Sequence, residues 1–380
     1  MHSRPQRLLH VIENLDRGAV ETWLLRMLRH ARERNIDLDW TFYCALGRPG
    51  SLDQDARALA APVVSSPVPI GHKAAFVRAL RAELQRGHYD VLHCHHDLVS
   101  AVYLFAGMGL PIRRRIVHVH NADESLPTPN PLKQVLLREP MRRFCLGLAD
   151  RIVGISDHTL DTFLGGRSRR SGRDIVHYYG VDTARFRDVS GDRIALRRKF
   201  NLPHDALILL FGGRLVPEKD PLFVIEVLAD LRSAEPRAFA VFAGTGDLAD
   251  AVRAKASKYN VASAVRLVGW QSNMPDVMRC SDWYILPRPE KPMEGFGLAV
   301  VEAQLAGLRL LLSNGIANDP LLPTAVFRRL PRAAGSQAWA NAAMDLFAMD
   351  PPSIQDAMSA LDRSPMQMDR ALAHLLSIHG

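Results

Sequence analysis

Short apolar runs alternate with longer amphipathic stretches along almost the whole chain. Residues 8–12 form an apolar run typical of a buried strand, and residues 20–34 place their leucines on one face of a helix. The same alternation predicts further strands in the first half at residues 38–44, 91–94, 115–119, 151–155 and 174–178. The helices expected between these strands cover residues 74–85, 98–108 and 132–146.

A second series of strands and helices begins after Gly180. Its strands are expected at residues 207–211, 238–243, 265–268, 283–286 and 308–312, and its helices at residues 221–232, 247–259, 274–280 and 298–306. This order builds βαβ units, in which helices cover both faces of a parallel sheet. We therefore expect an α/β fold of two Rossmann-like, doubly wound domains that face a cleft.

The expected domains cover residues 1–180 and 181–362. Between them, the polar and strand-free segment 180–190 is expected to act as a hinge. Residues 363–380 are expected to form a helix that packs back on the first domain. Doubly wound sheets bind ligands beyond the carboxyl ends of their strands, so the cleft is the expected site.

The composition is that of a globular chain long enough for two domains. Of its 380 residues, 47% are hydrophobic and 23% are charged, which argues against long disordered regions. The four cysteines form no C-x-x-C pair, so they indicate neither a cysteine-based zinc site nor a disulfide framework. No apolar run is long enough for a secretory signal or a membrane-spanning helix. We therefore expect a cytoplasmic protein, either soluble or attached to a membrane surface.

Positive charge is concentrated in the first half of the chain. Residues 1–180 hold 25 Lys and Arg against 18 Asp and Glu, whereas the remainder holds 23 against 22. A basic domain favours polyanions or an anionic membrane as partners, and a solvated basic face without a partner explains the charge equally well. Nucleic acid is not an expected partner, because the aromatic residues do not alternate with the basic ones.

The strongest chemical signal is the segment EGFGLAVVE, which runs from Glu294 to Glu302. Its glycines open a helix directly after a strand and a loop, and backbone N–H groups at such a helix start suit a phosphate. The two glutamates would lie about 12 Å apart along a helix, which is wide for a glycosidase pair. This spacing fits one acid on a sugar and the other on a ribose. The alternative is an exposed helix with two solvated acids.

Three glycine turns follow other predicted strands. After one of them, Arg214 and Lys219 could neutralise a diphosphate leaving group, although a loop salt-bridged to its own acids is the alternative. Gly244 and Gly246 satisfy G-x-G-x-x-A, but no acid follows about 20 residues later, which argues against a dinucleotide site and favours a turn near a nucleotide diphosphate. Gly18 joins the first strand to the first helix and offers a backbone approach point for a phosphate or an acceptor.

Several histidines lie at the ends of two neighbouring strands. His93, His95 and His96 follow one strand, and His118 and His120 end another. They could form a metal cluster, but no nearby carboxylate completes a recognisable ligand set, so we expect no metal. A histidine at the carboxyl end of a strand could hydrogen-bond a sugar hydroxyl, whereas core positions are the simpler interpretation for His93 and His118.

Taken together, these segments resemble the retaining GT-B glycosyltransferases of family 4. The resemblance covers most of the chain and includes the loop at Gly18, the strand end at 118–121, Arg214 with Lys219, the turn at Gly244 and the E-x7-E block at 294–302. It implies that the second domain binds a nucleotide-sugar and that the first binds the acceptor. It also implies transfer with retention of the anomeric configuration.

The resemblance implies a role for each matching residue in the second domain. Glu302 would bind the ribose, and Glu294 would contact the donor sugar. Arg214 and Lys219 would hold the diphosphate and stabilise its charge as it leaves. Further donor contacts are implied for the backbone amides of Phe296, Gly297 and Leu298 and for the turn at Gly244 and Gly246.

In the first domain, the resemblance implies that His120 approaches the donor sugar. It also implies that Gly18 lets the acceptor and a phosphate come close. No acidic D-x-D pair stands where a metal ion would be held, so we expect metal-independent transfer without a cofactor.

The overall pattern resembles enzymes of bacterial exopolysaccharide assembly, in particular xanthan-type mannosyltransferases. This implies a GDP-mannose donor, a polyprenyl-diphosphate-linked oligosaccharide acceptor and peripheral association with the inner face of the cytoplasmic membrane. The candidate contacts to the acceptor or membrane are Arg113, Arg114, Arg115, Arg142 and Arg143. An apolar helix face at Leu136, Leu137 and Phe144 could assist them or simply be core packing. The alternatives are a UDP-sugar transferase of the same fold and a non-catalytic protein that binds sugar nucleotides.

Overall fold

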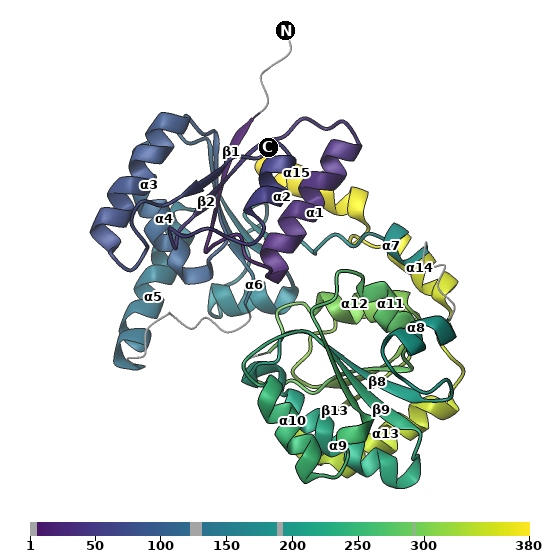
Figure 1. Cartoon of the computed structure of the whole chain (residues 1–380). Helices are drawn as coiled ribbons and strands as arrows, with labels where there is room; N and C mark the ends of the chain where they lie inside the picture. Colours follow the sequence, from purple (N-terminus) through teal and green to yellow (C-terminus); the bar gives the residue numbers. More distant parts are fainter. Residues whose placement is uncertain (1–5, 122–130, 188–192, 292) are drawn as a thin grey trace. The chain divides into compact units, whose positions relative to one another are not determined.

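The computed structural model describes residues 6–121, 131–187, 193–291 and 293–380. The chain forms two compact units (Figure 1). Unit 1 comprises residues 1–180 together with 368–380, and unit 2 comprises residues 181–367. Residues 363–367 thus belong to unit 2, whereas the sequence pattern placed them with the last helix. Part of the expected hinge, residues 188–190, lies outside the described residues.

Unit 1 is built on a seven-stranded parallel sheet with the strand order β3-β2-β1-β4-β5-β6-β7. The chain order of the strands reverses direction between β1 and β4, as in other doubly wound sheets. The strands are β1 (Arg7–Ile12), β2 (Asp39–Cys44), β3 (Val63–Ser65), β4 (Val91–Cys94), β5 (Arg114–Val119), β6 (Arg151–Gly154) and β7 (Asp174–Val176).

The helices of unit 1 cover both faces of this sheet. They are α1 (Ala19–Glu33), α2 (Asp53–Ala58), α3 (Lys73–Gly87), α4 (Ser100–Ala106), α5 (Pro131–Leu148), α6 (Asp157–Leu164) and α15 (Met368–His379), with a short turn η1 (Asp97–Val99) before α4. The C-terminal helix α15, drawn in yellow, packs beside α1 although the two are far apart in sequence (Figure 1).

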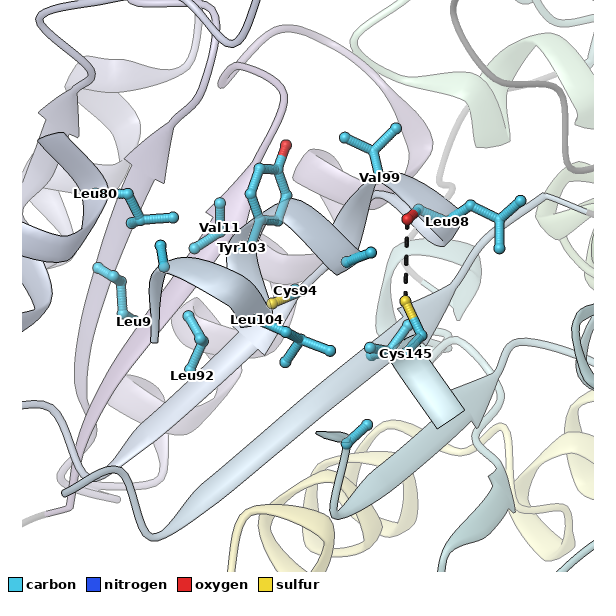
Figure 2. Packing of buried hydrophobic residues seen from close by; sticks show 14 of the residues in the cluster. Leu9, Val11, Leu80, Leu92, Cys94, Leu98, Val99, Tyr103, Leu104 and Cys145 are labelled. Atoms are coloured by element: carbon cyan, nitrogen blue, oxygen red, sulfur yellow. Dashed lines mark hydrogen bonds between the residues drawn. The ribbon is translucent and has the colours of Figure 1, made fainter. Parts of the chain in front are cut away.

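The two faces of the unit 1 sheet bury different chemistry because neighbouring strand residues point to opposite sides. One face carries aliphatic residues such as Leu9, Leu92 and Val117, which pack against α3 and α4 (Figure 2). Figure 2 also shows the thiol of Cys145 directed at the carbonyl oxygen of Leu98. The opposite face carries histidines, which lie against Trp23 of α1 and against α15.

Unit 2 contains a six-stranded parallel sheet with the order β10-β9-β8-β11-β12-β13. Its strands are β8 (Leu207–Gly212), β9 (Ala238–Ala243), β10 (Val265–Gly269), β11 (Trp283–Leu286), β12 (Arg309–Ser313) and β13 (Phe327–Leu330). Its α-helices are α7 (Ala184–Arg187), α8 (Arg193–Lys199), α9 (Pro221–Ala234), α10 (Ala249–Lys258), α11 (Met274–Arg279), α12 (Leu298–Leu305), α13 (Ser336–Ala348) and α14 (Ile354–Arg363). The shorter turns are η2 (Pro217–Lys219), η3 (Ala262–Ala264) and η4 (Arg332–Ala334).

The predicted parallel α/β architecture is confirmed, and the elements that the sequence missed are short or exposed. The edge strand β3 has only three residues, and the edge strand β13 leaves Phe327 and Arg328 exposed. Neither segment has a continuous apolar run, so neither gave a strand signal. The four cysteines are free and buried. Within the described residues, none of the helices is long and apolar enough to cross a membrane.

Candidate functional site

Two basic residues of unit 2 contact the carboxylate of Glu294, which lies in the segment between β11 and α12. The Lys219 Nζ atom lies 3.5 Å from the Glu294 carboxylate, and the Arg288 guanidinium donates a hydrogen bond to it at 3.0 Å. Lys219 ends the short turn η2 after β8, whereas Arg288 stands two residues beyond β11. Parallel neighbouring strands end at the same edge of a sheet, so β8 and β11 bring these groups together.

Glu294 is an ionised carboxylate held in a largely buried position. Burial by itself would raise its pKa, but the positive charges of Lys219 and Arg288 outweigh burial, and Arg214 adds to them. The pKa of Glu294 therefore lies below the ordinary value for glutamate. The side chains of Lys219, Arg288 and Glu294 keep 12–18% of their surface exposed, so a ligand can reach the cluster.

Close packing between neighbouring loops explains the glycines in the turns of unit 2. Gly244 has φ +153°, and a Cβ atom there would overlap the carbonyl oxygen of Gly213. At Gly246, with φ +156°, a Cβ atom would overlap the carbonyl oxygen of Leu215. Backbone hydrogen bonds join the same loops, including Gly213 N–H to the Ala243 carbonyl at 2.9 Å. Gly244 and Gly246 thus let the loops after β8 and β9 pack directly on each other.

The EGFG segment leads into α12 at the same end of the sheet. Gly297 has φ +84° and precedes Leu298, the first residue of α12, while Phe296 is buried. Gly297 therefore occupies a left-handed conformation that favours glycine. Glu302 is the fifth residue of α12 and is 8% exposed.

Both glutamates lie near the phenol of Tyr284, which donates a hydrogen bond to the Gly212 carbonyl at 3.0 Å. Burial raises the pKa of Tyr284, and the charges of Glu294 and Glu302 raise it further. The two acids therefore act on one buried group at the carboxyl edge of the sheet. The alternative of two independent solvated acids does not fit this burial.

The structure thus brings Arg214, Lys219, Glu294 and Glu302 to one region of unit 2. Arg288, which was not among the residues expected from the sequence, completes the surroundings of Glu294. Its position just beyond a predicted strand was the available signal, since the carboxyl ends of parallel strands are where ligand-binding residues concentrate.

In unit 1, the candidate residues Gly18 and His120 both lie against other residues of the same unit. Gly18 is the residue before α1, and a Cβ atom there would overlap the Glu21 carboxylate. His120 is buried, and its ring nitrogens lie 3.0 Å from His95 Nδ1 and 2.8 Å from the Tyr179 hydroxyl. Burial lowers the pKa of His120 to about 3, so the ring is neutral at physiological pH.

The arginines expected at an acceptor or membrane make contacts within the chain. Arg113 and Arg114 both donate to the carbonyl of Gly380, at 3.1 and 2.7 Å. Arg115 donates to the carbonyls of Ile112 and Leu110, both at 3.0 Å. Arg114 and Arg115 begin β5 and Arg113 directly precedes it, at the opposite end of that strand from His120. They therefore hold the C-terminus and the loop before β5.

Arg142 and Arg143 both bind the carboxylate of Glu139 on their own helix, at 2.7 and 3.0 Å. Arg142 is 9% exposed, and Arg167 also contacts Glu139. Hydrogen bonds from Arg142, then Arg167 and Arg143, lower the pKa of Glu139 to about 2. Of these two candidates, Arg143 has the accessible side chain, with 74% of its surface exposed.

The chain matches two models of sugar-transferring enzymes. Residues 20–185 match the model described as Glycosyltransferase Family 4, and residues 192–318 match the model described as Glycosyl transferases group 1. EpsF of Bacillus subtilis (strain 168), itself assigned as a glycosyltransferase, is 24% identical over 387 residues, which cover 100% of this chain and 98% of EpsF. A D-inositol 3-phosphate glycosyltransferase of Streptomyces avermitilis is 30% identical over 246 residues, which cover 60% of this chain and 51% of that protein.

A solved structure supports the fold over nearly the full length. HepE of Anabaena in complex with UDP superposes with a TM-score of 0.79 at 16% sequence identity. The match covers 98% of this chain and 99% of HepE. At this level of identity, the likeness concerns the fold, and it includes both α/β units.

Proposed function

We propose that this glycosyltransferase with the GT-B fold transfers a hexose from a nucleotide-sugar to an acceptor with retention of the anomeric configuration. The two family models and the likeness to HepE support the class of enzyme and the fold. The observation that carries the proposed mechanism is the gathering of Lys219, Arg288 and Glu294 close to Arg214 at the carboxyl edge of the unit 2 sheet.

In the proposed reaction, the bond between the sugar and the diphosphate breaks, and negative charge grows on the leaving diphosphate. Arg214 and Lys219 stabilise that charge, with backbone N–H groups at Gly297 and Leu298 beside them. Glu294 contacts the hexose, and Glu302 binds the ribose. The leaving phosphate takes the proton of the acceptor hydroxyl. Because the cations are side chains, we propose that transfer needs no metal ion.

His120 keeps its proposed role as a contact to the donor sugar under one condition. Both ring nitrogens already have partners, His95 and Tyr179. A sugar hydroxyl would therefore have to replace one of these hydrogen bonds. Gly18 is proposed to let the acceptor or a phosphate approach the start of α1.

The proposed donor is GDP-mannose, as the sequence resemblance implies. A UDP-sugar is the second candidate, and a specific observation favours it. HepE, which has the same fold, has been crystallised with UDP-glucose. The two donors differ in the base and in the hexose, so a direct comparison of turnover separates them.

The proposed acceptor is a polyprenyl-diphosphate-linked oligosaccharide at an anionic membrane. Exposed apolar side chains support this proposal, namely Phe105 of α4, Met108 just after it, and Leu132, Leu136 and Leu137 of α5. Phe144, by contrast, is partly buried against the core. The exposed leucines and Arg143 combine apolar and positive groups, which suit a membrane surface.

The test is a donor screen with labelled GDP- and UDP-sugars on membranes that contain lipid-linked acceptors. We expect transfer from one donor class in the presence of EDTA. Lys219→Ala is expected to lower kcat by about 10²–10³-fold, as for loss of one group that stabilises a developing anion. Lys258→Ala on α10 is the matched control, since Lys258 is exposed and remote in sequence from the site. Unchanged turnover in Lys219→Ala would refute the mechanism, and a requirement for added magnesium would refute metal independence.

A further inference from the structure

Eight histidines of unit 1 gather between the sheet and the helices α1 and α15. The H-x-H pairs of β4 and β5 place alternate residues on one face, and His10 of β1 is in register with His93 of β4. Rings from neighbouring strands lie close together, with centroids 5.3 Å apart for His93 of β4 and His118 of β5. The group, called the histidine cluster below, comprises His10, His93, His95, His118, His120, His177, His374 and His379.

The histidines form two chains of hydrogen-bonded rings. In the first chain, His95 lies between His10 and His120, with nitrogen–nitrogen distances of 2.9 and 3.0 Å. In the second, His93 lies between His379 and His118, at 3.1 and 3.2 Å. A neutral imidazole has one donor and one acceptor nitrogen, so each chain can satisfy its inner members.

The hydrogen bonds between the imidazole rings leave three ring nitrogens of the histidine cluster without a partner among the described residues. The Nε2 atoms of His10, His118 and His177 are buried and have no hydrogen-bond partner among the described residues. Buried polar atoms are almost always satisfied because an unmet one is costly. In the tautomer that leaves a lone pair on such a nitrogen, a metal ion could satisfy it, and His10 and His118 each belong to a set of three imidazoles described next.

Two sets of three imidazoles are spaced to meet at a single ion. The ligand atoms of His10, His93 and His95 lie within 4.8 Å of one another, as do those of His95, His118 and His120. Tetrahedral Zn²⁺, with Zn–N bonds of about 2.0–2.1 Å, holds its ligand nitrogens about 3.4 Å apart. Closing separations of up to 4.8 Å to about 3.4 Å needs changes of up to about 1.4 Å, which would bring three of these nitrogens onto an ion in place of a ring-to-ring hydrogen bond.

We propose that unit 1 binds one zinc-like transition-metal ion inside its histidine cluster, through three imidazoles that include His95. An all-nitrogen set suits Zn²⁺, Cu²⁺ or Ni²⁺, whereas Mg²⁺ and Ca²⁺ prefer oxygen ligands. His95 is essential because both sets contain it. Burial also lowers the pKa of His95, so protons do not compete for its nitrogens at neutral pH.

The ion would join β4 to β1 through His10, His93 and His95, or β4 to β5 through His95, His118 and His120, and its proposed role is to stabilise unit 1. The proposal replaces the expectation that these histidines hold no metal, which rested on the lack of a carboxylate ligand. Three-histidine zinc sites need no carboxylate, because a solvent ligand can complete the coordination. The metal independence proposed for the transfer reaction concerns unit 2 and is a separate question.

The test uses the full-length protein after removal of metal with a chelator. Calorimetric titration with Zn²⁺ is expected to show one tight site per chain, and bound Zn²⁺ is expected to raise the melting temperature. His95→Gln is expected to abolish that site. His72→Gln is the matched control, since His72 is an exposed histidine of the same unit and should leave binding unchanged.

A second measurement keeps the proposal open to refutation if His95→Gln does not fold. X-ray absorption of the zinc-loaded natural protein is expected to show three imidazoles around the ion. Fewer than three imidazoles, sulfur ligands, no tight binding, or equal binding by a folded His95→Gln variant would each overturn the proposal. None of these readouts depends on sugar transfer, so failure here and failure of the proposed function are distinguishable.

Discussion

The two units have the same parallel α/β architecture but hold their polar groups at different depths. In unit 2, Lys219, Arg288 and Glu294 stand at the carboxyl edge of the sheet, where partial exposure lets them stay charged. In unit 1, imidazoles occupy one face of the sheet itself, where burial keeps them neutral. Depth thus decides whether the polar residues of this fold serve as fixed charges or as a neutral hydrogen-bonded interior.

Lowering the pH is expected to destabilise unit 1 much more than unit 2, and this is the largest predicted difference between the units. Burial lowers the pKa of His120 and His379 to about 3, whereas histidine in an unfolded chain titrates near 6.5. Between these values the unfolded state binds more protons, so the stability of unit 1 falls as the pH drops from about 6.5 toward 3. Each such histidine contributes about 1.4 kcal/mol of lost stability per pH unit.

Hydrogen exchange of metal-free protein, corrected for the intrinsic pH effect, checks this prediction at pH 7 and pH 5.5. Unit 2 serves as the internal control because its single histidine, His204, is exposed. Protection should fall in β1, β4 and β5 and persist in β8 and β9. An equal loss in both units would contradict the prediction.

The next largest effect is expected for Glu294→Gln. The substitution keeps the size of the side chain but removes the charge that pairs with Lys219 and Arg288. Loss of a hydrogen bond to a charged group predicts a fall in kcat/KM of about 10- to 150-fold. Steady-state kinetics with the preferred donor measures it. Glu218→Gln is the control, since the exposed Glu218 lies on η2 beside Lys219, and similar losses in both variants would refute a specific role for Glu294.

Gly244→Ala tests the close packing of the loops after β8 and β9. The new Cβ atom would overlap the Gly213 carbonyl in a backbone conformation that disfavours alanine. We expect a loss of about 1–3 kcal/mol in the free energy of unfolding of unit 2. Urea denaturation of the variant checks this value. No change in stability would mean that the loops do not pack as described.

The smallest effect is expected for Gly147→Ala in unit 1. Gly147 is an exposed position of α5, and a Cβ atom there meets nothing within 4 Å. Alanine should therefore stabilise the helix by about 0.5–1 kcal/mol. The same urea assay measures the gain, and destabilisation would show that the local backbone is not a regular helix.

The sequence predicted those features that a single local pattern of residues specifies. The apolar runs of β1, β8 and β9 predicted these strands, and the glycine turns after them predicted ligand-binding loops at their carboxyl ends, with Lys219 in one of them. Arg288 was missed because nothing in its immediate sequence says which group it reaches. Arg113 and Arg114 were expected at an acceptor because their charge is visible in the sequence, whereas their partner Gly380 lies more than 260 residues away.

By itself, the sequence determined the two α/β units, the strand ends that carry charge and the alternation that puts His93 with His95 and His118 with His120 on one side. Only the tertiary structure decided that His10 and the C-terminal helix α15 with His379 join them. The physical reason is that hydrophobic periodicity acts within a strand or helix, while the partner of a buried polar atom depends on which elements pack together.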